Sequence, residues 1–395
     1  MTTVGLALAT SSWDDKEYAA IDRVIRSGMF TMGAEVAQFE RDFAEAMGAR
    51  HAVMVNSGSS ANLLIVAALR YHSSNPIPVG AEIIVPAVSW STTYYPLHQY
   101  GLRQKFVDID RATLNYDLAA LADAITDETR AIMVVNLLGN PNDFEKIKEI
   151  IGARDIILIE DNCESLGARF DGRLAGTFGI AGSYSAFFSH HISTMEGGLV
   201  TTDDEELYHI MLSVRAHGWT RNLPKTNLVT GTKSDDAFEE SFRFVLPGYN
   251  LRPLEMSGAL GQEQIRKLGM IVSERRRNAV IFREVLSNFS ALQAQAEIGE
   301  SSWFGFSMVL DETSSVSREQ LVAALVAEKI ETRPIVAGNF AKNEVVRKHM
   351  EHEIHGELTN ADHIDRNGLF IGNHHFPLEE QFECLHRALR RVFNG

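Results

Sequence analysis

The chain has 395 residues, of which 45% are hydrophobic and 23% are charged, so it can form one large α/β domain and a smaller one. Its formal net charge of −15 argues against nonspecific nucleic-acid binding, which needs clustered Lys and Arg. Its two cysteines, Cys163 and Cys384, exclude a disulfide framework and an iron–sulfur cluster held by about four thiolates, and they suit a reducing cytoplasm.

The N-terminal segment is not typical of a targeting signal. Residues 1–10 are mildly apolar, but no basic stretch precedes them and the charged run Trp13-Asp-Asp-Lys-Glu17 follows at once. Elsewhere no uninterrupted apolar run approaches the roughly 20 residues that cross a bilayer. We therefore expect a cytoplasmic protein without a membrane partner.

The first predicted element is an amphipathic helix over 15–27, with apolar Tyr18, Ile21, Val24 and Ile25 on one face. From about residue 50, strands and helices alternate. The expected strands cover 51–55, 82–86, 105–107, 131–136, 155–159, 183–186 and 198–201, and the expected helices cover 36–47, 60–71, 90–100 and 115–124. Because these strands are continuous apolar runs, we predict an α/β fold with a mostly parallel seven-stranded sheet and helices on both faces.

The last third of the chain predicts a smaller α/β domain. Residues 222–240 are polar and indicate a long surface loop. A long helix is expected over 254–286, a strand over 304–310, and helices over 317–328 and 378–393. We therefore divide the chain into a large domain, 1–255, and a small domain with its connecting helix, 256–395.

A turn rich in serine and glycine, Asn56-Ser-Gly-Ser-Ser-Ala-Asn62, joins a predicted strand to a predicted helix. Small residues let the backbone approach a phosphate closely, and a helix N-terminus offers free N–H groups with a favourable dipole. The same composition also serves as a simple helix N-cap. Both interpretations stay open on these residues alone.

A buried strand ends on carboxylates at Ile156-Ile-Leu-Ile-Glu-Asp-Asn162. Open α/β sheets bind ligands at the carboxyl ends of their strands, and a carboxylate there can keep a pyridine nitrogen protonated. The structural alternative is that Asp161 only caps the following turn.

Three further residues stand out between the predicted elements. Trp90 follows a strand end, so its ring either stacks on a flat cofactor or packs in the core. His190 and His191 are adjacent, but neighbouring side chains point in different directions and no carboxylate or cysteine lies at ligand spacing. We therefore expect no metal site there.

Taken together, these motifs resemble the nucleotide-sugar aminotransferase/dehydratase family, vitamin B6 enzymes with the aspartate aminotransferase fold (fold type I). The resemblance covers nearly the whole chain. It rests on Ser57-Gly-Ser-Ser-Ala61, Leu138-Gly-Asn-Pro141, Glu160-Asp-Asn162, Ser185 through Gly198, Gly248-Tyr-Asn-Leu-Arg252 and Arg333-Pro-Ile-Val-Ala-Gly-Asn339. It implies that the large domain binds pyridoxal or pyridoxamine phosphate.

In that family a lysine in Schiff-base linkage to the cofactor stands six residues before the Glu of a Glu-Gly-Gly run. Counting back from Glu196 gives His190, and no lysine occurs between Lys148 and Lys225. The number of residues between Asp161 and His190 is about the same as the number between the family's carboxylate and its lysine. Imidazole moves protons but forms no stable Schiff base. The resemblance therefore implies a cofactor that is bound without a covalent tether.

The resemblance assigns a role to each remaining site residue. His190 is the catalytic base. The resemblance implies that Gly58, Ser59 and Ser185 bind the cofactor phosphate, that Trp90 stacks on the ring and that Asp161 pairs with the ring nitrogen. It implies that Glu164 lies near the ring oxygen, where most relatives carry Gln or His. It also implies that Asn250 reaches the phosphate from the partner subunit of a homodimer. The implied nucleotide-sugar site comprises Met29, Phe30, Thr31, His217, Arg221 and Glu331.

The implied reaction belongs to the colitose branch of O-antigen biosynthesis, part of lipopolysaccharide assembly. L-Glutamate gives its amino group to the cofactor and leaves as 2-oxoglutarate. The amine then condenses with the C4 ketone of GDP-4-keto-6-deoxy-D-mannose, His190 removes a C4′ proton, and the C3 hydroxyl is expelled. Hydrolysis releases ammonia and a 4-keto-3,6-dideoxy sugar. An imidazole with a pKa near roughly 6.5 suits this proton transfer.

Four alternatives can be weighed against this reaction. An iron–sulfur 3-dehydrase also has histidine at this position, but it needs cluster cysteines. An ordinary 4-keto-sugar aminotransferase needs the missing lysine. A catalytically inactive binding protein has no need for Asp161 and Trp90. A 3-dehydratase acting on another nucleotide-linked sugar is also open, because GDP comes from the resemblance alone.

Overall fold

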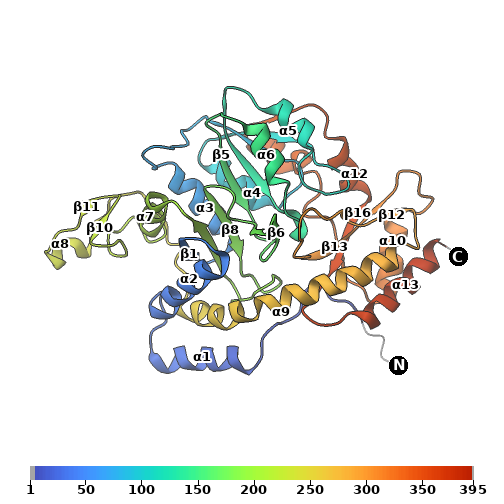
Figure 1. Ribbon diagram of the computed structural model, residues 1–395, viewed down its shortest axis with the longest axis horizontal. Coiled ribbons are helices and arrows are strands. Elements are labelled where there is room, and N and C mark those ends of the chain that lie inside the picture. The colour runs from blue at the N-terminus through green and yellow to red at the C-terminus, as the bar shows by residue number, and fades with distance from the viewer. Residues whose placement is uncertain (1–4, 394–395) are drawn as a thin grey trace.

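The computed structural model describes residues 5–393 and is built around one large sheet (Figure 1). Residues 1–4, part of the N-terminal segment examined above, lie outside the described residues. The sheet has eight strands, and only β9 runs against the others. In sheet order they are β1 (His51–Val55), β9 (Gly198–Thr202), β8 (Ala181–Ser185), β5 (Ile157–Asp161), β4 (Thr129–Val135), β2 (Glu82–Pro86), β3 (Arg103–Val107) and β15 (His352–Ile354).

The predicted mostly parallel α/β sheet is confirmed, but the predicted number of seven strands is wrong. The eighth strand, β15, comes from the C-terminal part of the chain and lies parallel to β3, with His352 opposite Gln104. Three residues are too few to show a strand period in the sequence. Lys105 on β3 sits 2.9 Å from Glu82 and 3.8 Å from Glu353, so its buried charge has carboxylates on both neighbouring strands.

Helices cover both faces of the sheet because alternate strand residues point to opposite sides. On β4, Met133 joins one core cluster while Ile132 and Val134 join another. One face carries α3 (Gly58–Leu69), α4 (Ser91–Gln99) and α7 (Glu205–Val214). The other carries α2 (Ala34–Met47), α5 (Leu118–Ala124), α6 (Phe144–Ile151) and the first half of α9 (Glu255–Leu286).

The predicted smaller α/β region is confirmed around a second sheet. Its antiparallel strands are β12 (Leu292–Gln293), β13 (Gly305–Leu310), β16 (Gly368–Gly372) and β14 (Thr332–Arg333). The second half of α9 packs there with α10 (Arg318–Ala327) and α13 (Glu379–Phe393), and α12 (Thr359–Asn367) contacts β13 and β16. Helix α11 (Glu344–His349) instead joins the core of the large sheet through Val346. Because α9 spans both regions, the boundary after residue 255 stays a prediction.

Most predicted elements occur within a few residues of their expected bounds, with two informative exceptions. The helix expected from residue 115 begins only at Leu118, because Asp117 caps it and Tyr116 bridges to Ile109 instead. The expected loop 222–240 contains the hairpin β10 (Thr226–Asn227) and β11 (Gly231–Thr232) and the short helix α8 (Ala237–Ser241). Helices α6 and α7 have no counterpart among the predicted elements.

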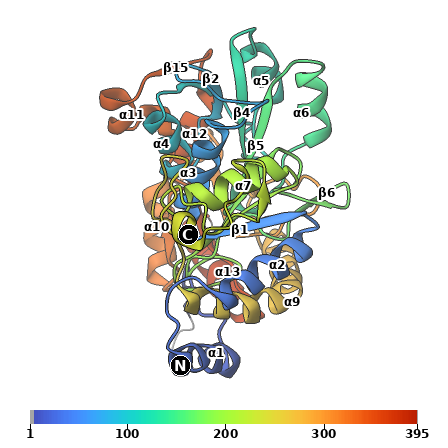
Figure 2. The same cartoon turned by 90° about the vertical axis from the view of Figure 1, so that its left-hand side faces the viewer.

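Helix α1 (Asp15–Ser27) has its predicted bounds but packs by another face. It lies against α9 and apart from the large sheet (Figure 2). Glu17, Ala20 and Val24 are buried there, whereas Tyr18 is 61% exposed and Ile25 53% exposed. Lys267 of α9 bonds the Glu17 carboxylate at 2.7 Å, which explains why an acidic side chain replaces an apolar one in the contact. Among residues 5–393, no helix is long and apolar enough to cross a membrane.

Candidate functional site

The turn between β1 and α3, here called the cradle, brings the N-terminus of α3 against the end of β8. Ser57 is the N-cap of α3, and its Oγ accepts a hydrogen bond from the Ser60 amide at 3.1 Å. Gly58 is the first helical residue, and a Cβ there would lie 2.7 Å from the Ser185 Cβ. Only glycine therefore lets the helix N-terminus meet the end of β8. The N-cap and phosphate interpretations are compatible, because the cap leaves other first-turn amides free.

Asp161 ends β5 next to this cradle, and its carboxylate accepts several hydrogen bonds. Its Oδ2 accepts hydrogen bonds from Asn62 at 2.8 Å and Thr93 at 2.7 Å, and its Oδ1 accepts from the Cys163 amide at 3.2 Å. The Cys163 contact is the turn cap considered above. The other two contacts come from α3 and α4, so they orient the carboxylate from the cradle side.

The preceding residue, Glu160, has a different role. Its buried carboxylate accepts hydrogen bonds from the amides of Gly176 at 2.6 Å and Gly179 at 2.8 Å. It therefore fixes the loop that enters β8. Adjacent side chains of a strand point to opposite faces, so only one of the two carboxylates can face the cradle.

Two more predicted cofactor residues, Trp90 and Ser59, lie where α4 begins next to α3. Trp90 is its N-cap residue and is 58% exposed, so its ring is available to a ligand and is not core packing. Ser59 on α3 donates to the Thr92 hydroxyl at 3.0 Å. Asn62 donates to the Thr92 carbonyl at 3.3 Å, so α3 and α4 meet at this point.

His190 lies in the loop that joins β8 to β9. Its amide donates to the Phe187 carbonyl at 2.9 Å, and its ring centroid is 5.0 Å from the Phe304 ring. Its buried Nδ1 has no hydrogen-bond partner among residues 5–393. Burial, followed by the charge of Arg275, lowers the pKa of His190 to about 3. The expectation of an ordinary imidazole pKa is therefore wrong, and the ring is an unprotonated base at neutral pH.

His191 is placed differently, as a structural residue. It is buried, and its Nε2 lies 3.0 Å from the Ser302 carbonyl oxygen. Only an Nε2–H can satisfy that carbonyl. Burial lowers the pKa of His191 as well, with Arg275 as the second cause.

Glu164 connects the Asp161 side of the site to the His190 side. Its Oε2 accepts a hydrogen bond from the Leu138 amide at 3.0 Å, and the Phe304 amide donates to the Leu138 carbonyl at 3.0 Å. Burial raises the pKa of the Glu164 carboxyl to about 7, against the lowering effect of the Leu138 bond. A carboxyl with this pKa can hold or release a proton near neutral pH.

Four more predicted residues lie on two exposed segments of the chain. Asn250 is exposed, and its Oδ1 accepts from the Arg252 Nε at 2.9 Å; the following carbonyl, of Leu251, accepts from the Asn56 amide at 3.0 Å beside the cradle. Met29, Phe30 and Thr31 are exposed after α1. The Phe30 carbonyl accepts from the Glu255 amide at 3.1 Å, which fixes this segment to the start of α9.

The predicted sugar-site residues fall into two groups. The His217 ring lies 4.8 Å from the Trp219 ring, and the Arg221 guanidinium lies 4.4 Å over that ring. Glu331 lies elsewhere, at the N-terminal segment, where its carboxylate accepts from the Leu8 amide at 2.9 Å. No hydrogen bond or ring contact of the described residues joins Glu331 to His190.

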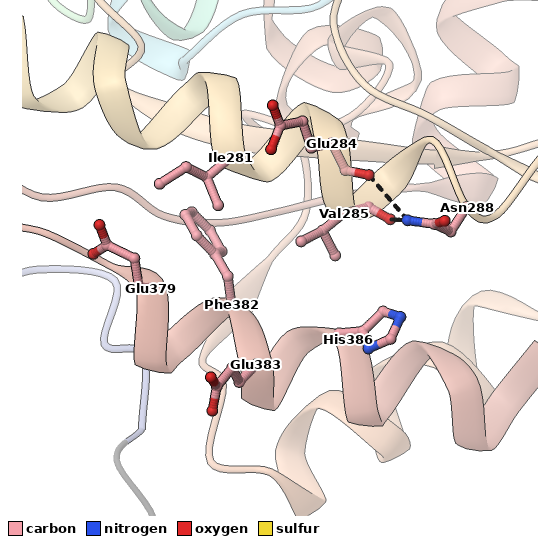
Figure 3. A pocket seen from close by; sticks show the side chains of 8 residues that line it. All are labelled: Ile281, Glu284, Val285, Asn288, Glu379, Phe382, Glu383 and His386. Atoms are coloured by element: carbon pink, nitrogen blue, oxygen red, sulfur yellow. Dashed lines mark hydrogen bonds between the residues drawn. The ribbon is translucent and has the colours of Figure 1, made fainter.

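A hollow between α9 and α13 is a separate feature (Figure 3). It is lined by Ile281, Glu284, Val285, Asn288, Glu379, Phe382, Glu383 and His386. None of these is a predicted site residue, and the three glutamates would repel a phosphate. The hollow is therefore not the cofactor site.

Three site neighbours have no role in the sequence-based prediction: Asn62, Thr93 and Phe304. Asn62 follows Gly58 by four residues on one helix, so helical spacing could have placed it beside the cradle. Thr93 follows Trp90 by three residues in the next helix. Phe304 carries no such signal, because the fold brings it to His190 across more than a hundred residues.

The comparisons with known proteins agree with this geometry. The profile of the DegT/DnrJ/EryC1/StrS aminotransferase family matches residues 11–386. The GDP-4-keto-6-deoxy-D-mannose 3-dehydratase of Escherichia coli O55:H7 is 58% identical over 387 residues, which cover 98% of this chain and 100% of the relative.

Two solved structures are similar over almost their full length. The E. coli GDP-4-keto-6-deoxy-D-mannose-3-dehydratase with bound hydrated PLP has a TM-score of 0.97 at 58% identity, covering 98% of this chain and 100% of that one. A GDP-4-keto-6-deoxymannose-3-dehydratase with a trapped PLP-glutamate geminal diamine has a TM-score of 0.96 at 58% identity, covering 97% and 100%. These likenesses confirm the predicted fold type.

Proposed function

Because this chain belongs to the DegT/DnrJ/EryC1/StrS aminotransferase family, we propose that it removes the C3 hydroxyl of GDP-4-keto-6-deoxy-D-mannose, with L-glutamate as amino donor. The products are GDP-4-keto-3,6-dideoxymannose, 2-oxoglutarate and ammonia. The reaction belongs to cytoplasmic synthesis of the colitose of O-antigen lipopolysaccharide. The observation that carries the proposal is the imidazole of His190, which stands at the family's lysine position in the loop after β8, while Gly58 and Ser185 of the cradle meet at the end of that strand.

The residues of the cradle fit pyridoxal or pyridoxamine phosphate. When bound, this cofactor supplies an electron sink and, in its amine form, the group that condenses with the sugar ketone. Gly58, Ser59 and Ser185 offer a helix N-terminus and hydroxyls to the phosphate. Asp161, already oriented by Asn62 and Thr93, is placed to keep the pyridine nitrogen protonated. The exposed ring of Trp90 would provide a stacking face, and Glu164 would lie near the ring oxygen, as the resemblance implies.

His190 decides which reaction follows. Its neutral ring can accept the proton that leaves the C4′ atom, and its Nδ1 has no protein partner to compete for that proton. Unlike lysine, it does not capture the aldehyde form of the cofactor. The amine form is therefore free for the sugar, which favours loss of the C3 hydroxyl over transfer of the amino group.

The reaction is tested by incubating enzyme, cofactor, L-glutamate and GDP-4-keto-6-deoxymannose and measuring ammonia and sugar products together. We expect ammonia in equal amount to a 3-deoxy sugar, and none without glutamate. A 4-amino sugar without ammonia would instead identify an aminotransferase. Turnover of a different nucleotide-linked 4-keto sugar alone would transfer the same reaction to that substrate.

The cofactor is expected to bind without a covalent bond. Borohydride treatment of the loaded, folded enzyme followed by intact-mass analysis should leave the mass of the chain unchanged, since no lysine lies between Lys148 and Lys225. An aminotransferase of the same family with its lysine serves as the positive control. A stoichiometric phosphopyridoxyl adduct on this chain would contradict the assignment.

We propose that the active unit is a homodimer with shared sites. Large apolar side chains are exposed on the segments around the site: Met29 is 57% exposed, Phe30 54% and Leu254 61%. Thr31 forms a bridge with Leu254, so these residues make one apolar patch. A second copy of the chain that covers this patch would also bring Asn250 to a neighbouring cradle.

Charge placed in the patch is expected to break the dimer. The double variant Met29→Glu, Leu254→Glu should sediment as a monomer at concentrations where the parent sediments as a dimer, because each buried carboxylate would lose its hydration. Val326→Glu is the matched control, since Val326 is a 59% exposed apolar residue on α10. Equal dissociation of the two proteins would contradict this interface.

A further inference from the structure

The residues that pack against His190 form a turn with an unusual backbone. Trp303 has a φ of +48°, a left-handed conformation that a bulky residue rarely adopts, and its side chain is buried. The amides on either side are fixed: Ser302 donates to the Gly139 carbonyl at 2.9 Å, and Phe304 to the Leu138 carbonyl at 3.0 Å. The turn therefore holds the Phe304 ring in one place, beside the imidazole.

Arg275 on α9 clamps the carbonyls of this turn. Its side chain is buried, and its Nη1 donates to the Phe304 carbonyl at 2.9 Å and to the Trp303 carbonyl at 3.4 Å. Asn373 completes the clamp, because its Nδ2 donates to the Trp303 carbonyl at 2.8 Å and to the Arg275 carbonyl at 3.1 Å. The carbonyls of Trp303 and Phe304 therefore both accept hydrogen bonds from buried side chains.

The charge of Arg275 is not neutralised by the protein. Among residues 5–393 the guanidinium makes no ion pair, and its buried Nε has no hydrogen-bond partner. Burial lowers the Arg275 pKa only to about 10, so the group stays charged at neutral pH. Buried cations are normally paired, and loss of the partner is costly. An uncharged donor could bind the same two carbonyls, so the buried charge of Arg275 needs an explanation beyond holding the turn.

Histidines surround this cation. The pKa values of His190, His191, His374 and His375 are all lowered, mainly by burial, and the charge of Arg275 is the next cause for each. His191 is further affected by Arg276, and His375 by Lys267. For His190, Arg275 is the one charged group that contributes.

We propose that Arg275 is a positioning residue for the reaction, which holds the Trp303–Phe304 turn against the His190 ring. The charge of the same guanidinium is the second cause, after burial, that lowers the pKa of His190. The inference rests on the proposed role of His190 as the base. Arg275 thus acts on proton transfer indirectly, through the Trp303–Phe304 turn and the His190 ring.

The test uses the amino-transfer half-reaction, in which the loaded enzyme reacts once with L-glutamate. The variants are Arg275→Gln, which keeps a donor without charge, and Arg275→Lys, which keeps the charge. Arg276→Gln is the matched control, because Arg276 is the next residue of α9 and donates to the Ser301 carbonyl at 2.8 Å, but its charge is paired with Glu300. The measurements are the rate, the isotope effect with α-deuterated glutamate, and the affinity for pyridoxamine phosphate.

We expect Arg275→Gln to slow the half-reaction by roughly the 10²-fold that follows a displacement of about 1 Å in a catalytic group. The isotope effect should rise while cofactor affinity stays at the parent value, because only proton transfer is impaired. Removing the cation raises the His190 pKa, so the variant should lose activity at a higher pH than the parent as the solution is acidified. Arg275→Lys should lose activity at the same acidic pH as the parent. Arg276→Gln should resemble the parent in rate, isotope effect, cofactor affinity and pH dependence.

A second variant covers the case in which Arg275→Gln does not fold. Phe304→Leu removes the ring beside His190 but keeps the carbonyl that Arg275 binds, so it should slow the half-reaction while cofactor affinity stays at the parent value. If folded Arg275→Gln matches Arg276→Gln in rate and isotope effect, the inference is wrong; where Arg275→Gln does not fold, the same result for Phe304→Leu overturns it. A His190→Asn variant with the parent rate would instead overturn the proposed function itself, so the two failures are distinguishable.

Discussion

Replacing His190 with asparagine is expected to slow formation of the 3-deoxy sugar by at least roughly the 10²–10⁴-fold that a positioned acid–base group contributes. Asparagine is close to imidazole in size but cannot accept a proton at the C4′ atom. The cofactor should still bind, because the cradle at Gly58, the Trp90 ring and the Asp161 carboxylate are unchanged. Both half-reactions should be slowed, since one base serves both.

The measurement combines single-turnover kinetics of each half-reaction with the dissociation constant of pyridoxamine phosphate. His98→Asn is the matched control, because His98 is exposed near the end of α4 and far along the helix from Trp90. A rate near that of the parent would move the base elsewhere. His191 would then be the first candidate, although its Nε2 is engaged by the Ser302 carbonyl.

Replacing His190 with lysine should change the reaction rather than only slow it. Lysine can attach covalently to the cofactor aldehyde, so it competes with the amino donor and suppresses loss of the C3 hydroxyl. The covalent form should appear as a borohydride-dependent mass increase, which the parent lacks. Some 4-amino sugar is expected as a new product, because lysine at this position is what the family's aminotransferases carry.

The products of His190→Lys are followed by mass spectrometry with glutamate as donor, beside His190→Asn as the variant that loses the base without gaining an amine. Production of the 3-deoxy sugar at the parent rate by His190→Lys would show that residue 190 does not control the outcome. Control would then have to lie with the sugar pocket that we assign to His217 and Glu331.

The sheet could be predicted because its strands are buried on both faces and therefore appear as continuous apolar runs, as at 157–161. The strand β15 could not, because three residues carry no period. The exposed face of α1 was also unpredictable, since Tyr18 and Ile25 have the pattern of a buried face while the Lys267–Glu17 pair makes the real contact.

The candidate site was predictable where the motifs are local, as at Gly58 and Asp161, and where the resemblance supplied a position, as at His190. Its long-range parts were not. The spacing of Glu160 and Asp161 does not say which carboxylate faces the cradle, and no local pattern joins Arg275 to a turn near residue 303. The strongly lowered pKa of His190 depends on that distant charge and on burial, so the ordinary value was the only one available from the sequence.

The fate of the amino nitrogen tests the central claim most directly. Enzyme, pyridoxal phosphate and GDP-4-keto-6-deoxymannose are incubated with L-glutamate that carries an isotopic label on its nitrogen, and the label is followed in ammonia and in the sugar. With His190 in place of lysine, we predict that all transferred label appears as free ammonia, in equal amount to a sugar that has lost its C3 hydroxyl. Label retained in a 4-amino sugar that keeps its C3 hydroxyl would contradict the account.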